Sequence, residues 1–307
     1  MGPAAEVGGD FSLMRILLTG GAGQVGRELR RTLAGFAEVI APDRDILDLA
    51  SADSIVAAVR GARPDLIVNA AAYTAVDKAE SEPDLAMSVN GAAPRVLAEE
   101  ALQAGAMVIH YSTDYVFDGS KDGAYREEDL PVPLNVYGRT KLAGERALAD
   151  AGCPYLVFRT SWVYGPSGQN FLLTMLRLAR ERKELKIVDD QFGAPTPARA
   201  IAEATADAIA QISVKGRLEQ DRFREMSGIY HMTASGRTSW YGFAVEILRG
   251  QEGVAALRPI PSAAYASPAK RPGNSLLDNS KLNKVFGISL PDWQVGLRMC
   301  MAELRER

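Results

Sequence analysis

Short apolar runs alternate with longer segments whose apolar residues recur at helical spacing. The runs cover residues 14–19, 38–41, 65–68, 106–111 and 155–159, and each has the length and content of a buried strand. Strands that alternate with helices indicate parallel pairing and right-handed crossover connections. The first 160 residues therefore predict an α/β fold, a doubly wound parallel sheet of the Rossmann-like kind.

The alternation loosens in the second half of the chain. Amphipathic helices are predicted at 170–182 and 199–212, a loop at 189–197, a charged surface excursion at 216–226 and a strand that rejoins the sheet at 228–232. The rest mixes short helices with turns rich in proline and glycine, including a long irregular loop at 267–275. We predict a dinucleotide-binding domain of 14–160 plus about 189–232, and a smaller C-terminal substrate-binding lobe of about 161–188 plus 233–307. Residues 1–13 are interpreted as a disordered leader or an expression remnant.

Composition excludes several classes of function. The formal net charge of -3 gives no electrostatic reason to expect nucleic acid or an anionic membrane as a partner. No apolar run approaches the roughly 20 residues that cross a bilayer. The two cysteines, Cys153 and Cys300, form no CxxC motif, and the two histidines are His110 and His231, so a metal centre is not predicted. A reducing cytoplasm is the expected location, and His110 is interpreted as an ordinary strand residue.

A glycine-rich turn follows the first strand. Gly20, Gly23 and Gly26 have the spacing that permits a tight turn, close approach of the backbone to a pyrophosphate, and close packing of helix on strand. The amino end of the following helix then faces the anion. This arrangement predicts dinucleotide binding, although a tight turn without a ligand would have the same spacing.

Two neighbouring residues after the second strand favour opposite cofactors. Asp43 lies about 20 residues past the glycines, where a carboxylate accepts the ribose hydroxyls of NAD. Arg44 follows, and an arginine there could bind the 2′-phosphate of NADP. The choice between NADH and NADPH stays open, and a solvated turn is the alternative. The alanines after the third strand suggest a bare surface for a flat ligand, or merely close packing.

Tyr137 and Lys141 lie four residues apart on a predicted helix that Asn135 can cap. They share one face, so the ammonium can favour the phenolate and lower the pKa of the phenol. The pair could then transfer a proton near neutral pH. Such a pair also occurs by chance, with a core tyrosine and a solvated lysine. The fourth strand, however, ends in Ser112, Thr113 and Asp114, at the edge where this type of sheet binds ligands.

These motifs, taken in order, resemble the extended short-chain dehydrogenase/reductase superfamily. Longer segments resemble the dTDP-4-dehydrorhamnose reductase family in particular, and the resemblance covers nearly all of the chain from Met14 onward. The segments that carry it are residues 68–80, 110–119, 133–138, 158–164, 190–196 and 271–275.

The resemblance implies a role for individual residues. Tyr137 would be the catalytic acid, Lys141 would lower its pKa and hold the nicotinamide ribose, and Thr113 would bind the same sugar oxygen. Thr113, Asp114 and Trp162 would contact the sugar nucleotide; Arg271 is a position-based candidate for its diphosphate, with a solvated loop arginine as the alternative. NADPH or NADH would be bound by Tyr137 and Lys141 together with Gly20, Gly23, Gln24, Val25, Gly26, Asp43, Asp48, Leu49, Ala72, Tyr73, Thr74 and Tyr111.

The implied reaction reduces the C4 ketone of dTDP-4-dehydro-β-L-rhamnose to dTDP-β-L-rhamnose. A reductase of another dTDP-4-keto-6-deoxysugar stays open, as does a non-catalytic nucleotide-binding regulatory subunit, although such subunits commonly lose the tyrosine or the lysine. Dehydratases carry a catalytic glutamate where this chain has Tyr115, which argues against dehydration. The expected partners are a dTDP-sugar and a second copy of the chain, without nucleic acid or membrane; a bridging Mg²⁺ is considered, but its ligands are not assigned.

Overall fold

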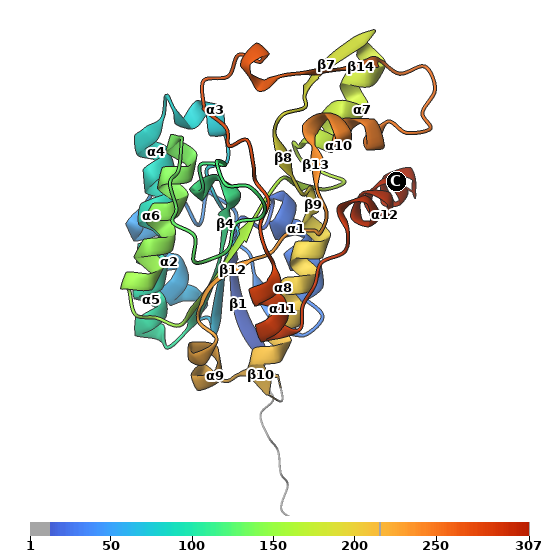
Figure 1. Ribbon diagram of the computed structural model, residues 1–307. Coiled ribbons are helices and arrows are strands. Elements are labelled where there is room, and N and C mark those ends of the chain that lie inside the picture. Colours follow the sequence, from blue (N-terminus) through green and yellow to red (C-terminus); the bar gives the residue numbers. More distant parts are fainter. Residues whose placement is uncertain (1–12, 215, 307) are drawn as a thin grey trace, which may run out of the picture.

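A six-stranded parallel sheet forms the centre of the molecule (Figure 1). The computed structural model describes residues 13–214 and 216–306, so the predicted leader lies outside the described residues apart from Leu13. The strand order is β12-β5-β4-β3-β1-β2, and every pairing between neighbours is parallel. The predicted Rossmann-like sheet is therefore confirmed. Its strands are β1 (Met14–Thr19), β2 (Ala37–Ile40), β3 (Leu66–Asn69), β4 (Met107–Thr113), β5 (Tyr155–Thr160) and β12 (Gly228–His231).

Helices cover both faces of the sheet. Successive residues of a strand point to opposite faces, so Ile16 and Leu18 pack on one side and Leu17 on the other. The first side is covered by α1 (Gln24–Leu33), α8 (Ala198–Ile212) and α11 (Ser280–Phe286). The second is covered by α2 (Ala52–Ala62), α5 (Ala93–Ala104) and α6 (Val136–Asp150). Burial on both faces explains why the strands are apolar throughout.

Local signals place the helix ends correctly. Ser51 caps α2 by accepting from the Ser54 amide, and Asn135 caps α6 by accepting from the Gly138 amide at 2.8 Å. The helical segment that begins at Pro83 is not uniform: α4 (Pro83–Met87) passes into a π-helical turn, η1 (Ser88–Ala92), before α5 begins. Pro94 lacks the amide hydrogen that a regular helix requires. Asn90, at the centre of this turn, is buried.

A smaller lobe stands above the carboxyl edge of the sheet in Figure 1. Its core joins α7 (Phe171–Glu181), α10 (Trp240–Ile247) and α12 (Trp293–Glu306) with a two-stranded parallel sheet of β7 (Glu184–Val188) and β14 (Ala256–Ile260). By contrast, α11 packs in the core of the large sheet although it follows β14. The predicted division into two discontinuous domains stays a prediction.

Short elements connect the two regions. The predicted loop at 189–197 contains two short strands that pair elsewhere: β8 (Phe192–Gly193) with β13 (Thr238–Ser239), and β9 (Thr196–Pro197) with β6 (Val163–Tyr164). The charged excursion contains a short helix whose Phe223 is buried. The remaining elements are α3 (Val76–Ala79), η2 (Asp114–Val116), β10 (Ser213–Val214), β11 (Arg217–Leu218), α9 (Gln220–Glu225) and η3 (Ser262–Ala264).

Candidate active site

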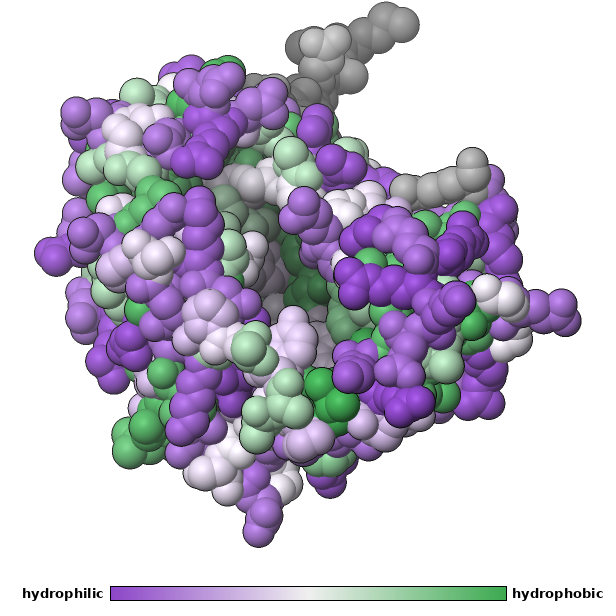
Figure 2. Space-filling model, turned by 90° about the horizontal axis from the view of Figure 1, so that it is seen from above, coloured by the Kyte–Doolittle hydropathy of each residue, from purple (hydrophilic) through white to green (hydrophobic). Residues whose placement is uncertain are grey.

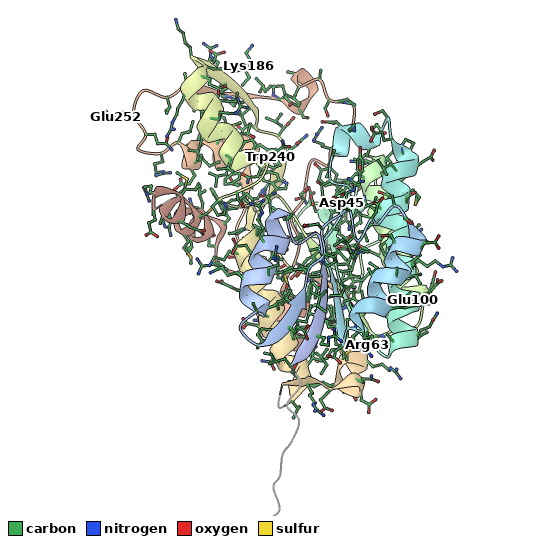
Figure 3. All side chains as sticks on the ribbon, turned by 180° about the vertical axis from the view of Figure 1, so that it is seen from behind. Asp45, Arg63, Glu100, Lys186, Trp240 and Glu252 are labelled. Atoms are coloured by element: carbon green, nitrogen blue, oxygen red, sulfur yellow. The ribbon has the colours of Figure 1, made fainter. Side chains whose placement is uncertain are left out.

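The residues predicted to act together gather at the carboxyl edge of the sheet. Seen from this side, the surface is hollowed between the sheet and the lobe (Figure 2). Asp45, in the loop after β2, lies at this end of the sheet, as does Trp240 of the lobe, whereas Arg63 lies at the opposite end (Figure 3). Ligands of open parallel sheets bind beyond the carboxyl ends of the strands, so the hollow has the expected position.

The glycine turn brings α1 close to β1 and leaves the amino end of the helix accessible. Gly20 has a φ of 67°, and a Cβ there would lie 2.7 Å from the Ala71 backbone nitrogen. A Cβ on Gly26 would lie 2.0 Å from the Gly20 carbonyl oxygen. These contacts allow α1 to begin close to β1. The first turn of α1 carries no acidic residue, and Gly23 at its N-cap is exposed, so the unpaired helix amides can meet an anion.

Gln24 and Val25, both partly exposed, follow in the first turn of α1. The Gln24 side-chain oxygen accepts from Asn170 at 2.9 Å, which links the glycine turn to the N-cap of α7 in the lobe. Val25 packs against the core of the sheet. The glycine turn is thus held from both regions of the molecule.

The loop after β2 contains the residues predicted for the adenosine end of the cofactor. Asp43 and Arg44 are both exposed, and the Arg44 guanidinium lies 3.7 Å from the Asp48 carboxylate. Asp48 also accepts from the Ala50 amide, which shapes the turn. Leu49 is buried in the core beneath α2, so its side chain is a packing residue.

The chain after β3 runs along the hollow. Ala72 and Tyr73 are partly exposed and Thr74 is exposed. Asn90 of the π-helical turn holds Tyr73 from both sides: its oxygen accepts from the Tyr73 amide at 2.8 Å and its nitrogen donates to the Tyr73 carbonyl at 3.0 Å. No motif in the sequence marks Asn90, and only its place opposite this segment in the fold reveals its role.

Tyr137 and Thr113 meet at the carboxyl end of β4. Tyr137 as a residue is partly exposed. Burial of its phenol raises the pKa of Tyr137 to about 12, and the neighbouring Thr113 hydroxyl offsets part of this effect. The phenol is therefore protonated at neutral pH. The expected lowering of this pKa by Lys141 is not found.

Lys141 lies one helical turn from Tyr137 and is buried. Its ammonium donates to the Tyr111 carbonyl at 2.5 Å and lies 3.1 Å from Nε2 of His110. Burial lowers the pKa of Lys141 to about 8, although the carboxylate of Glu145 acts in the opposite direction. The lysine thus contacts β4 at two points, whereas a solvated lysine was the chance alternative.

The Tyr111 side chain does not reach the hollow. Its hydroxyl bonds to Thr205 of α8 at 2.7 Å, and its ring packs in the core of the sheet. Only its backbone carbonyl faces Lys141. Neighbouring side chains of a strand point to opposite faces. The His110 side chain therefore faces Lys141 of α6, while the Tyr111 ring faces α8.

Asp114 and Arg271 connect the sheet to the irregular loop. Asp114 is buried, and burial raises the pKa of its carboxyl group to about 6 despite hydrogen bonds from Ser275 and Thr113. Arg271 is half-buried and makes a charge-assisted bond of 2.8 Å from Nη2 to the Asp77 carboxylate, while Nη1 lies 3.1 Å from the other oxygen. Arg271 is therefore not the solvated loop arginine that the sequence left as the alternative. Its bonds to Asp77 hold the irregular loop against α3.

Trp162 lies at the entrance of the lobe. Its ring stacks on Trp240 of α10 with centroids 3.6 Å apart and planes 8° apart. Trp162 adopts a φ of 48°, which is unfavourable for a residue with a Cβ. Gly193 accommodates the indole, because a Cβ there would lie 2.6 Å from the ring. The stacked pair forms a partly exposed aromatic wall beside the site.

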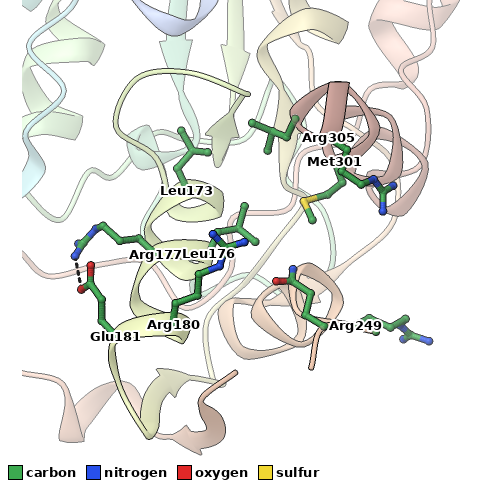
Figure 4. A pocket seen from close by; sticks show the side chains of 11 residues that line it. Leu173, Leu176, Arg177, Arg180, Glu181, Arg249, Met301 and Arg305 are labelled. Atoms are coloured by element: carbon green, nitrogen blue, oxygen red, sulfur yellow. Dashed lines mark hydrogen bonds and ion pairs between the residues drawn. The ribbon is translucent and has the colours of Figure 1, made fainter. Parts of the chain in front are cut away.

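A separate hollow of about 650 Å³ lies in the lobe between α7, α12 and the turn at residues 249–251 that follows α10 (Figure 4). Its lining combines leucines with arginines, including Leu173, Arg180 and Arg305, and none of the predicted site residues. Within residues 13–214 and 216–306, no group of three or more His, Cys, Asp or Glu side chains is placed to hold a metal ion. No helix in this part of the chain is long and apolar enough to cross a membrane.

Comparison with known proteins identifies the family. The model described as RmlD substrate binding domain matches residues 14–306. A dTDP-4-dehydrorhamnose reductase from Burkholderia thailandensis is 50% identical over 299 residues, with 95% of this chain and 99% of the relative covered. Among solved structures, the Clostridium acetobutylicum dTDP-4-dehydrorhamnose reductase is 36% identical with a TM-score of 0.88, covering 95% of this chain and 100% of that one.

A further solved structure carries information on the cofactor. The dTDP-4-dehydrorhamnose reductase of Bacillus anthracis, in complex with NADP, is 32% identical with a TM-score of 0.86, covering 95% of this chain and 99% of that one. These matches extend over nearly the whole chain and confirm the resemblance found in the motifs. The chain belongs to the dTDP-4-dehydrorhamnose reductase family.

Proposed function

We propose that the protein reduces the C4 ketone of dTDP-4-dehydro-β-L-rhamnose to dTDP-β-L-rhamnose, with a reduced nicotinamide dinucleotide as the hydride donor. One observation carries the proposal: Tyr137 and Lys141 lie one helical turn apart on α6, and Thr113 at the carboxyl end of β4 is close enough to the phenol to influence its pKa. Membership of a family of dTDP-4-dehydrorhamnose reductases supports the choice of substrate.

Tyr137 is the proton donor. Its pKa of about 12 keeps the phenol protonated at neutral pH, as reduction of a ketone requires. The alkoxide that develops on the sugar is a stronger base than a phenolate, so the proton moves to it as charge appears. A donor whose interaction strengthens as this charge develops lowers the barrier.

Thr113 completes the donor pair. Its hydroxyl lies at the end of β4, where it donates to Asp114 at 3.0 Å and accepts from the Tyr115 amide at 3.2 Å. Rotation of the hydroxyl away from Asp114 would let it donate to the same sugar oxygen as Tyr137. Two donors on one developing oxyanion form a small oxyanion hole.

Lys141 carries its ammonium one helical turn from Tyr137. This charge does not lower the pKa of Tyr137, so we assign Lys141 to the nicotinamide ribose, which its ammonium would bind. The fixed position of Lys141 on two β4 acceptors holds its charge in place.

The residues of the glycine turn fit a dinucleotide cofactor. Gly20, Gly23, Gln24 and Val25 would hold its diphosphate against the amino end of α1, and Lys141 would hold the nicotinamide ribose. The bound cofactor would supply the hydride. We propose a preference for NADPH, since Arg44 is exposed and its contact with Asp48 is long enough to be exchanged for a phosphate. The NADP complex of the Bacillus anthracis relative supports this choice.

The sugar nucleotide lies between the sheet edge and the lobe. We assign Asp114 to the sugar hydroxyls and the Trp162 ring to an apolar face of the ligand, as their positions beside Thr113 and the hollow suggest. Arg271 is occupied by Asp77, so a contact with the substrate diphosphate would require this pair to open or share its charge. A homodimer and a cytoplasmic location complete the proposal. The cytoplasmic location agrees with Cys153 and Cys300, which are both buried and do not form a disulfide.

Identification of the product by NMR tests the proposal directly. Purified protein with NADPH and dTDP-4-dehydro-β-L-rhamnose should oxidise the cofactor and yield dTDP-β-L-rhamnose, whose ring couplings report the configuration at C4. A C4 epimer would favour a reductase of another dTDP-4-keto-6-deoxysugar. Absence of cofactor oxidation, with nucleotide binding retained, would favour a regulatory subunit.

A further inference from the structure

A row of polar side chains crosses the sheet beneath the active site. Thr19 of β1 is paired in register with Asn69 of β3, and Asn69 with His110 of β4. The Thr19 hydroxyl lies 2.6 Å from the Asn69 oxygen, and the Asn69 amide nitrogen lies 2.9 Å from Nδ1 of His110. Each of these side chains is 1% exposed. Buried polar groups need partners, and here each group has one in the next strand.

The row ends on the active-site lysine. Nε2 of His110 lies 3.1 Å from Nζ of Lys141, which is itself 2% exposed. The lysine has a second fixed acceptor in the Tyr111 carbonyl. His110 thus contacts α6 one turn from Tyr137, and its partners on β1 and β3 come from the strands that carry the cofactor-binding turns.

The chemistry of this contact fixes the state of the imidazole. An ammonium only donates hydrogen bonds, so Nε2 must accept and the imidazole must be neutral with its proton on Nδ1. Burial first, and then the charge of Lys141, hold the pKa of His110 well below its usual value. A half-turn of the Asn69 amide exchanges its oxygen and nitrogen, which gives the Nδ1 proton an acceptor without moving the row.

We propose that His110, fixed by Asn69 and Thr19, is a positioning residue that fixes the Lys141 ammonium, one helical turn from Tyr137, for the reduction. The inference rests on the proposed function. It assigns a role to a histidine that the sequence presents as an ordinary strand residue. His110 acts through Lys141 and does not contact the reacting atoms.

The other charged and titratable groups around Lys141 have partners of their own or are neutral. On α6, Glu145 is bound to Arg159 of β5 through two hydrogen bonds of 2.9 and 2.6 Å. On β4, Tyr111 offers its carbonyl, and Asp114 lies beyond Thr113; Tyr137 is protonated at neutral pH. Removal of His110 therefore removes a neutral acceptor and leaves these charges in place, so the neutral form of Lys141 is favoured.

Two substitutions separate positioning from packing. His110→Leu should lower kcat about tenfold or more, because a hydrogen bond to a charged group is lost. The KM for the sugar nucleotide should change little, and the basic limb of the kcat–pH profile should move to lower pH. His110→Gln places an amide oxygen near the position of Nε2, and it should restore most of kcat and the original limb.

His231 offers a matched control. It is the second of only two histidines, it is buried on β12, and it is packed against Phe117. His231→Gln should leave the pH limb where it is, whatever its effect on stability. A His110→Leu enzyme with the kcat and pH limb of the wild type would overturn the inference. Wild-type protein that produces no reduced sugar would instead overturn the proposed function.

A spectroscopic test needs no substitution at His110. With two histidines, ¹⁵N NMR of the imidazole nitrogens is assignable by comparison with His231→Gln. His110 should be neutral at pH 7, with its proton on Nδ1. A proton on Nε2, or a charged imidazole, would overturn the inference even if His110→Leu fails to fold.

Discussion

The catalytic edge of the sheet and the substrate side of the hollow are built in different ways. Thr113 lies at the end of β4. Tyr137 and Lys141 lie on α6, the next long element in the chain, which packs on the same sheet. The substrate side joins segments that are distant in the chain: Trp162 stacks on Trp240, and Arg271 binds Asp77 across 194 residues.

The two sides also differ in burial. Lys141 and the row that ends on it are almost completely buried, so strand pairing fixes their positions. Trp162, Trp240 and Arg271 are only partly buried, and their mutual contacts hold them. Under the proposed function, the chemistry is fixed by the sheet, whereas recognition of the substrate depends on contacts that can adjust.

Removal of the Tyr137 hydroxyl should have the largest effect. Tyr137→Phe keeps the ring but removes the proton, and kcat should fall about 10²- to 10⁴-fold, the usual contribution of a general acid. Tyr115→Phe is the matched control, since its ring lies 5.5 Å from that of Tyr137. It should retain kcat within about fivefold. Steady-state kinetics of both variants would decide, and equal losses would remove Tyr137 as the specific donor.

The pH dependence should reveal Lys141 rather than Tyr137. The ammonium is complete below about pH 7 and is lost as pH rises through the Lys141 pKa of about 8. The value of kcat should therefore fall up to about tenfold per pH unit above this point. A limb that appears only near the Tyr137 pKa of about 12 would contradict the assignment.

The free energy of unfolding should respond differently from kcat above pH 8. The folded-state pKa of Lys141 is below its ordinary value of 10.5, so between about pH 8 and 10.5 the unfolded chain binds more protons at this residue. Its contribution to the free energy of unfolding then increases with pH. Thermal melts across the limb distinguish this loss of activity from unfolding.

Disruption of the aromatic wall should affect binding more than chemistry. Trp240→Ala removes the stack on Trp162, which is worth about 0.5–1.5 kcal/mol beyond the buried area. The KM for the sugar nucleotide should rise up to about tenfold, while the KM for NADPH should stay near that of the wild type. A loss confined to kcat would show that the wall positions catalytic groups as well.

The loop after β2 should control the choice of cofactor. Arg44→Ala should raise the KM for NADPH about fivefold and leave the KM for NADH nearly unchanged, as expected for an exposed arginine that meets a phosphate. Comparison of both cofactors with the same protein gives the measurement. Equal changes for NADH and NADPH would place the 2′-phosphate elsewhere.

The smallest effect is expected at the ion pair that fastens the irregular loop. Asp77→Asn and Arg271→Lys should each raise the KM for the sugar nucleotide about two- to fourfold, since a partly exposed pair is worth about 0.2–1 kcal/mol. A double-mutant cycle should find the two changes non-additive. Additive changes would separate the roles of the two residues.

Much of the catalytic edge could be predicted from sequence because its signals are local. The strand–glycine–helix order places Gly20 to Gly26, and Asn135 with the spacing of Tyr137 and Lys141 fixes the face of α6. The sequence could not give the direction of the pKa shift of Tyr137, because burial depends on what packs around the phenol. Nor could it show that the Tyr111 ring points away from the site.

The sequence by itself determined the order of strands and helices, the glycine turn, the shared helix face of Tyr137 and Lys141, and the family, since each depends on short-range periodicity or on contiguous motifs. Only the tertiary structure decided what lies between the strands and across the hollow. The row from Thr19 to Lys141 exists because three strands pair in one register, and the contacts of Trp162 and Arg271 exist because distant segments pack together. Such contacts depend on the closure of long loops, which leaves no periodic signal in the chain.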